Sequence, residues 1–202
     1  KTGEILALIG SKDYFADPYP LGCDEKKGNK CLFAPKYDVA TIGQRQPGSS
    51  FKPIVYATAF KEGYTPDTPL WDVRTEFNPL CTVDGLSSTD PYGNPCYHPQ
   101  DYDGKNRGKV TIRKALSGSL NIPAVKTLYL AGIPESLETA RDLGITTLTD
   151  TKNYGLSLVL GGGDVNLLEL VSAYGVFATE GNYIAPISIL KITDSEGNII
   201  EE

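Results

Sequence analysis

The chain has 202 residues, of which 40% are hydrophobic and 22% are charged. This length and apolar content are sufficient for one globular core, and they exclude an intrinsically disordered chain. The net charge of -6 argues against a nucleic-acid-binding surface, because phosphate binding requires clustered Lys and Arg. The acidity is typical of a soluble surface instead.

The chain contains no apolar run long enough to span a membrane and no signal-peptide pattern. It begins with Lys1 and has no Met, so we expect it to be part of a longer protein. Membrane contact is therefore expected only through an anchor of the parent protein outside these residues.

The first predicted element is a strand. Thr2-Gly3 indicates a turn, and the apolar residues 4–10 predict a short buried strand whose partner would lie upstream of Lys1. Residues 11–46 are rich in turn-forming residues and are expected to be loops.

A helix is predicted over residues 50–61, where apolar residues recur and Gly63 follows as a stop. Pro53 is tolerated only in the first turn of a helix, so this helix should begin close to Ser49. Residues 64–108 are predicted to be irregular. Such a long region inside one domain is usually functional or an insertion.

The second half of the chain is predicted to be mainly helical. Short helices are expected at residues 111–117, 123–131 and 136–143, with a break over residues 118–121 between the first two.

The last predicted elements are a helix and a hairpin. Residues 161–163 are three glycines that indicate a flexible loop, and Asp164 is expected to cap a helix over residues 165–179. Residues 187–201 predict a β-hairpin.

The four cysteines form two local pairs, Cys23 with Cys31 and Cys81 with Cys96. Four cysteines allow three connectivities, and local pairing closes the shortest loops. A disulfide in the second pair would contribute roughly 3 kcal/mol on a chain-entropy estimate. Disulfides would indicate an oxidising, extracytoplasmic location. A zinc site is a weaker alternative, because there is no Cys-x-x-Cys and His98 is the only histidine; four unpaired thiols remain another.

Ser49 and Lys52 form a Ser-x-x-Lys motif at the start of a predicted helix. Residues three apart lie on one helical face, so the lysine can reach the serine hydroxyl. A serine hydroxyl is a weak nucleophile that needs a nearby base, and a partly desolvated lysine can be that base. By itself the motif is weak, because two common residues at this spacing arise by chance in a chain of this length.

Ser119 and Asn121 form a Ser-x-Asn motif in the predicted break between two helices. Side chains at a break are free to face a cleft, where the serine could relay a proton and the asparagine could hold a substrate amide. Helix capping is the structural alternative, and by itself this motif favours capping.

The two motifs together change the interpretation. Ser-x-x-Lys, Ser-x-Asn and Lys-Thr-Gly are the signature set of penicillin-binding proteins and serine β-lactamases. Residues 45–53 (RQPGSSFKP) resemble the nucleophile segment of class A penicillin-binding proteins, and residues 111–126 resemble the second segment. Residues 2–7 and 160–181 are similar to framework stretches of the same transpeptidase domain.

The resemblance covers nearly the whole chain. It implies one partial transpeptidase domain over residues 1–202, with insertions near residues 16–37 and 78–98 around the two cysteine pairs. It also implies an α+β fold, with an antiparallel sheet flanked by helices and a mostly helical part that carries the second motif.

The resemblance implies a peptidoglycan D,D-transpeptidase that uses no cofactor or metal. Ser49 would attack the D-Ala-D-Ala carbonyl of a stem peptide, and Lys52 would be the base. Ser119 would pass a proton to the leaving amine, and Asn121 would bind the acyl-side amide. A second stem peptide would then be cross-linked, and β-lactams would acylate the same serine. The parent would act at the extracytoplasmic face of a bacterial cytoplasmic membrane.

The chain departs from the family pattern in one respect. The family's Lys-Thr-Gly follows Ser-x-Asn, whereas the triplet here is Lys1-Thr2-Gly3, which we interpret as a turn. We therefore expect the chain to be truncated before the catalytic triplet, which would leave the fragment alone incomplete as an enzyme.

Three alternatives stay open at this point. One is a non-catalytic domain that recognises penicillin or muropeptides. Another is a carboxypeptidase or β-lactamase of the same fold, which the lifetime of the acyl-enzyme would separate from a transpeptidase. The third is a scaffold or interaction fragment.

Overall fold

The computed structural model describes residues 2–23 and 30–201. The chain divides into two compact units. The first consists of Lys1–Arg45, Arg141–Thr147 and Val165–Glu202, and the second of Gln46–Ala140 and Leu148–Asp164. Within the described residues, no helix is both long and apolar enough to cross a membrane.

The core of the second unit is the contact between helices α1 (Lys52–Lys61) and α3 (Asn121–Ala131). α1 continues from a short 3-10 helix, η2 (Gly48–Phe51), and has Pro53 in its first turn, where the missing N–H costs no hydrogen bond. Both helices are buried on several faces, which is typical of helices at the centre of a core. Their fully buried apolar side chains are Ile54, Val55, Tyr56, Ala124, Val125 and Leu128.

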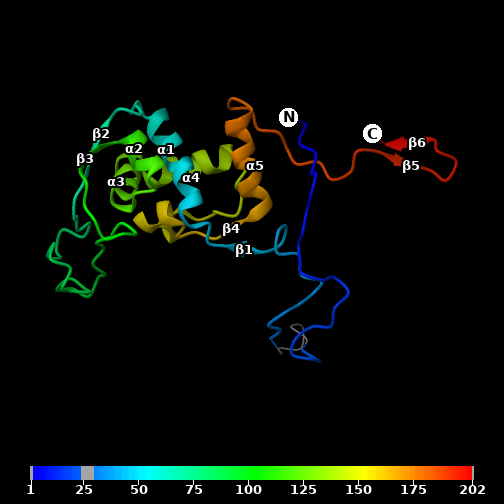
Figure 1. The fold of residues 1–202 in the computed structure, drawn as a ribbon, viewed down its shortest axis with the longest axis horizontal. Coiled ribbons are helices and arrows are strands. Elements are labelled where there is room, and N and C mark those ends of the chain that lie inside the picture. The colour runs from blue at the N-terminus through cyan, green and yellow to red at the C-terminus, as the bar shows by residue number, and fades with distance from the viewer. Residues whose placement is uncertain (1, 24–29, 202) are drawn as a thin grey trace. The chain divides into compact units, whose positions relative to one another are not determined.

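Further elements lie between Gln46 and Asp164, and several of them are labelled in Figure 1. They are β2 (Pro69–Asp72), β3 (Gly108–Thr111), α2 (Ile112–Ser117), α4 (Ile133–Asp142), η3 (Thr151–Asn153) and η4 (Leu156–Leu160). β2 and β3 pair antiparallel with Leu70 opposite Val110, and both side chains are buried. Alternation along β2 therefore directs Leu70 and Asp72 inward and leaves Trp71 exposed.

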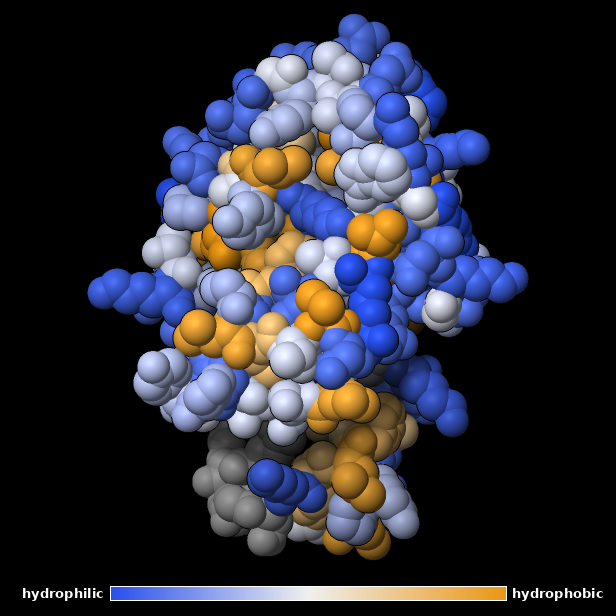
Figure 2. All heavy atoms as spheres, turned by 90° about the vertical axis from the view of Figure 1, so that its left-hand side faces the viewer, coloured by the Kyte–Doolittle hydropathy of each residue, from blue (hydrophilic) through white to orange (hydrophobic). Residues whose placement is uncertain are grey.

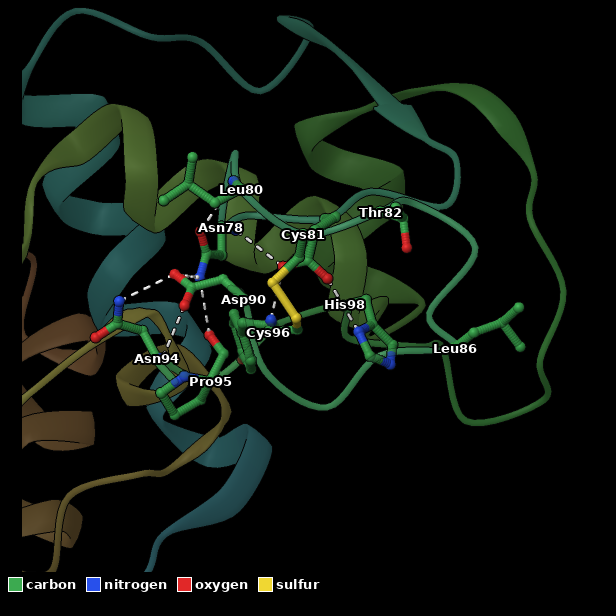
Figure 3. The surroundings of a disulfide bond; sticks show 12 residues. Asn78, Leu80, Cys81, Thr82, Leu86, Asp90, Asn94, Pro95, Cys96 and His98 are labelled. Atoms are coloured by element: carbon green, nitrogen blue, oxygen red, sulfur yellow. Dashed lines mark hydrogen bonds and ion pairs between the residues drawn. A yellow bond between two sulfur atoms is a disulfide. The ribbon is translucent and has the colours of Figure 1, made fainter. Parts of the chain in front are cut away.

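The loop between β2 and β3 is ordered without regular secondary structure. A disulfide joins Cys81 to Cys96, and the buried carboxylate of Asp90 organises the turn between them (Figure 3). Asp90 Oδ1 accepts hydrogen bonds from the backbone N–H groups of Tyr92 (2.8 Å) and Asn94 (2.9 Å). The side chain of Asn94 donates to Asp90 Oδ2, and such bonds to the charged carboxylate lower the pKa of Asp90 to about 2.

The first unit contains β1 (Gln44–Arg45), β4 (Val165–Asn166), α5 (Leu167–Ala178), β5 (Ile192–Thr193) and β6 (Ile199–Glu201). β1 pairs antiparallel with β4, and β5 pairs antiparallel with β6 as the short hairpin that the sequence predicts. A second disulfide joins Cys23 to Cys31. Both bonds follow the local pairing favoured by the sequence, and they exclude the alternatives of a zinc site and of free thiols.

The predicted strand over residues 4–10 is wrong. Glu4 makes a single parallel bridge to Ile187, and the side chains of Leu6 and Ile9 are 92% and 84% exposed. A buried strand requires a ladder of backbone hydrogen bonds to a neighbouring strand. Here, among the described residues, Ile187 bonds only to Gly3 and Ile5, at the start of the segment.

Several helix boundaries also differ from the predictions. α5 begins after Asn166, whose Oδ1 accepts the N–H of Leu168 at 2.9 Å, and not after Asp164, because Val165 belongs to β4. α4 begins three residues earlier than expected, and α3 begins at Asn121 instead of Pro123.

We predict that Leu128→Ala lowers the free energy of unfolding by about 2–5 kcal/mol, because Leu128 is fully buried between helices and its truncation leaves a cavity. Leu130→Ala on the same helix is the matched control, since Leu130 is 46% exposed. Denaturant unfolding measures both variants. Equal losses would contradict the assignment of the α1–α3 contact as the core.

Candidate active site

Ser49 lies within η2, and Lys52 follows it as the first residue of α1. The 3-10 turn is closed by the backbone N–H of Lys52, which donates to the carbonyl oxygen of Ser49. The side chain of Ser49 is exposed, whereas Lys52 is 1% exposed. The segment thus presents a hydroxyl to solvent beside a buried amine.

The ammonium group of Lys52 donates three hydrogen bonds to the Ser-x-Asn motif. Nζ lies 2.6 Å from the carbonyl oxygen of Ser119, 3.1 Å from Ser119 Oγ and 2.7 Å from Asn121 Oδ1. The structure therefore brings together two motifs that are separated by 67 residues in the sequence. Within the described residues, Ser49 Oγ makes no hydrogen bond to Lys52 Nζ.

Burial lowers the pKa of Lys52 from 10.5 to about 8, and the negative charge of Asp101 opposes this effect. An ammonium has three N–H donors, and in the protonated state all three are used by Ser119 and Asn121. Loss of one proton would create a lone pair on Nζ, which can accept a proton from a hydroxyl. An amine with a pKa close to neutral pH is suited to act as a general base.

The position of Ser119 depends on an uncommon backbone conformation. Its φ of 50° lies in the left-handed region, which costs a residue with a side chain about 1–3 kcal/mol. The turn ends α2, with Ser119 N–H donating to Leu116 O and Leu120 N–H donating to Ala115 O. This conformation lets both the carbonyl and the hydroxyl oxygen of Ser119 reach Lys52.

Asn121 is the first residue of α3, where the helix leaves backbone N–H groups without a partner inside the helix. Its side chain bridges two parts of the site, since Oδ1 accepts from Lys52 and Nδ2 donates to Gln100 O at 2.8 Å. Asn121 therefore does more than cap a helix, which was the structural alternative for this motif.

Three residues at the site lie outside the motifs. Gln100 and Asp101 contact Asn121 and come from the region predicted to be irregular, where no periodicity indicated a role. Gly161 lies against Gly48, and a Cβ at Gly161 would collide with the Gly48 backbone. The sequence pattern indicated a flexible glycine loop, whereas Gly161 is required here by a close backbone contact and by its φ of 90°.

Two other sequence features make contacts of their own, outside the two motifs. His98 Nδ1 contacts Glu76 Oε2 at 3.0 Å, and the residue lies in the loop between β2 and β3. In the triplet at the N-terminus, Lys1 lies outside the described residues, and Gly3 O accepts a hydrogen bond from Ile187 N.

Comparison with known proteins gives consistent results. A family model described as the penicillin binding protein transpeptidase domain matches residues 1–201. Penicillin-binding protein 2D of Bacillus subtilis is 33% identical over 203 residues, which cover 100% of this chain and 25% of that protein. Penicillin-binding protein 1A of Aquifex aeolicus is 34% identical over 206 residues, which cover 100% of this chain and 23% of that protein. The chain thus spans about a quarter of the length of these relatives.

Solved structures show the same similarity. Penicillin-binding protein 1A from Haemophilus influenzae matches 82% of this chain and 23% of its own, with a TM-score of 0.69 and 29% identity. PonA1 from Mycobacterium tuberculosis, in complex with penicillin V, matches 82% of this chain and 43% of its own, with a TM-score of 0.67 at 22% identity. These similarities confirm the expected α+β fold.

We predict that Lys52 titrates with a pKa of about 8, well below 10.5, when its side-chain resonances are followed by NMR and assigned with a Lys52→Met variant. The unfolded state then binds one more proton than the folded state between about pH 8 and 10.5. The free energy of unfolding should therefore rise with pH over this window more in the parent than in the variant. A pKa near 10.5 and identical slopes would contradict the assignment.

Proposed function

The chain belongs to the family of penicillin-binding protein transpeptidase domains, and on this basis we propose that its parent protein is a peptidoglycan D,D-transpeptidase that forms an acyl-enzyme on Ser49. The observation that carries the proposal is the buried amine of Lys52, which lies three residues after Ser49 and binds both Ser119 and Asn121. Desolvation costs a charged lysine free energy, but it also lowers the pKa of the amine, as a general base requires.

In the proposed acylation step, Ser49 Oγ attacks the carbonyl carbon of a D-Ala-D-Ala peptide bond. The neutral amine of Lys52 takes the hydroxyl proton as the C–O bond forms. The C–N bond then breaks, and the proton reaches the leaving amine through Ser119 Oγ, which lies 3.1 Å from Nζ. The terminal D-Ala leaves, and the acyl group remains on Ser49 as an ester.

In the second step, the amino group of a neighbouring stem peptide attacks the ester carbonyl. The new C–N bond forms, the C–O bond to Ser49 breaks, and the proton lost by the amine returns to Ser49 Oγ by way of Lys52. Asn121 binds the acyl-side amide through its second Nδ2 hydrogen, because the first is donated to Gln100 O.

A β-lactam follows the first step with an internal leaving group, so it becomes attached to Ser49 and leaves slowly. Penicillin is therefore the probe that separates the steps, since it reports acylation without the amine acceptor. The two disulfides support an extracytoplasmic location, where stem peptides and β-lactams are met.

We predict that the full-length protein gains the mass of one penicillin per molecule in intact-protein mass spectrometry, and that the Ser49→Ala variant gains none, because it lacks the attacking oxygen. Ser50→Ala is the matched control. It removes the neighbouring hydroxyl, which donates to Pro47 O at 2.6 Å, and it should still be acylated because Ser49 Oγ is retained. No adduct on the parent, or an adduct on Ser49→Ala, would overturn the proposal.

We also predict that Lys52→Met lowers the rate of acylation about 10²–10⁴-fold, the usual contribution of a general base. The rate constant is measured with a fluorescent penicillin under pseudo-first-order conditions. Lys61→Met, on the same helix, should react at the parental rate. A Lys52→Met variant that folds and reacts as fast as the parent would exclude Lys52 as the base.

A further inference from the structure

We propose that Asp101 is a positioning residue of this active site, which holds Asn121 and Lys52 in the arrangement that acylation of Ser49 requires. The inference rests on the proposed function, and it adds a residue that belongs to neither motif. Its evidence is a set of contacts that connect the loop before β3 to the N-terminus of α3 and to the buried amine.

The first contact fixes the backbone at Asn121. Asp101 Oδ1 accepts the N–H of Asn121 at 2.5 Å and the N–H of Ile122 at 3.2 Å. The residue before the helix, Leu120, has no polar side chain and makes no cap of its own. A carboxylate from 20 residues upstream thus caps α3, where a negative charge also complements the helix dipole.

The second contact fixes the side chain of Asn121. The neighbouring residue Gln100 accepts Asn121 Nδ2 through its carbonyl oxygen at 2.8 Å. This bond identifies which end of the amide is the nitrogen, so Oδ1 is the atom that faces Lys52 Nζ at 2.7 Å. Two consecutive residues therefore hold Asn121 at both its backbone and its side chain.

An ion pair keeps Asp101 in place. Asp101 is 4% exposed, and its second oxygen, Oδ2, accepts a hydrogen bond from Arg107 Nη1 at 3.1 Å. Arg107 also binds Asp103 at the surface, where Arg107 Nη2 lies 2.9 Å from Asp103 Oδ2. The backbone N–H of Arg107 donates to Asp72 Oδ2 at 2.8 Å. A buried carboxylate requires such a partner, because an unpaired buried charge is strongly destabilising.

Asp72 is the other buried carboxylate of this cluster, and it takes up a proton more easily than an ordinary Asp. It is completely buried, and its Oδ1 has no hydrogen-bond partner among the described residues. Burial raises the pKa of Asp72, and the charge of Asp101 raises it further. The guanidinium of Arg107 lies close to both carboxylates. When Asp72 is protonated, this guanidinium forms its ion pair in the cluster with Asp101 alone.

The chain before Gln100 is anchored as well. Glu76 Oε1 accepts the N–H of Tyr97 at 2.6 Å, and Glu76 Oε2 contacts His98. Cys96, which forms the disulfide with Cys81, is the residue before Tyr97. Figure 3 shows Cys96 and His98 on the same short stretch of chain. These contacts hold the loop so that Gln100 and Asp101 lie against the N-terminus of α3.

Asp101 also acts on the amine through its charge. It raises the pKa of Lys52, in opposition to burial. The other groups that interact with Asp101 are Arg107, Asp72 and Tyr56, and burial raises the pKa of Tyr56 to about 12, so this phenol stays neutral in the assay range. Removal of the Asp101 charge should therefore move the titration of Lys52 to lower pH.

The test compares Asp101→Asn with Asp103→Asn in the full-length protein. Both substitutions remove a carboxylate that binds Arg107, but only Asp101 contacts Asn121. The rate of acylation by a fluorescent penicillin is measured from about pH 6 to about pH 10, a range that spans the Lys52 pKa of about 8. Thermal unfolding of each variant is measured alongside.

For Asp101→Asn we expect the plateau rate to fall about 10–100-fold, because small displacements of catalytic groups cost this much, and the midpoint of the rate–pH curve to shift to lower pH. Asp103→Asn should keep the parental plateau and midpoint. A structural role alone would lower the melting temperature of Asp101→Asn without moving the midpoint, and that result would overturn the inference.

Two further outcomes are decisive. Equal plateaus and midpoints in the two variants, with a reactive parent, would overturn the positioning role and leave the proposed function intact. A parent that is not acylated would overturn both proposals. If Asp101→Asn does not fold, Asp101→Glu is compared with Asp103→Glu. The first should lose plateau rate because its carboxylate is displaced by one methylene, and equal rates would overturn the inference.

Discussion

The structure around the site depends on the burial of one ammonium group. Lys52 is almost completely removed from water, so each of its N–H groups needs an oxygen acceptor supplied by the protein. These acceptors come from Ser119 and Asn121, at the point where α2 ends and α3 begins. The break between the two helices thus supplies the oxygen acceptors that solvate the amine in place of water, and the contact of α1 with α3 holds the lysine and the break together.

This arrangement places several unfavourable features in one region. Ser119 adopts a left-handed conformation, and Asp72 and Asp101 are buried close together. Each feature costs free energy by itself, and each is held by neighbours: the packed α1–α3 core, and the ion pair from Arg107. The face drawn in Figure 2 is largely polar with apolar side chains in small groups, which is ordinary for a protein surface. A left-handed backbone and two buried carboxylates thus occur together where the chemistry is proposed.

The sequence predicted the parts of the site that follow local rules. The helix after Ser49 and the break at Ser119 were both visible, because proline, glycine and apolar periodicity act over a few residues. The role of Asp101 was not visible, since the N–H groups that it caps lie about 20 residues away and nothing in an irregular segment reports such a distance. The strand expected over residues 4–10 failed for a related reason: an apolar stretch shows that a segment can pair but not that a partner is present.

The contact of Gly161 with Gly48 limits how this region can vary during evolution. At Gly161 any side chain would meet backbone, and both glycines have positive φ, so a substitution has a steric and a conformational cost at once. A neighbouring side chain can be exchanged for a smaller one to make room, but a backbone cannot. A side chain at Gly161 would therefore disturb the place of the segment before Ser49 against η4. Substitutions of the exposed side chains around Ser49 are therefore tolerated more readily than substitutions that would move the backbone of Ser49.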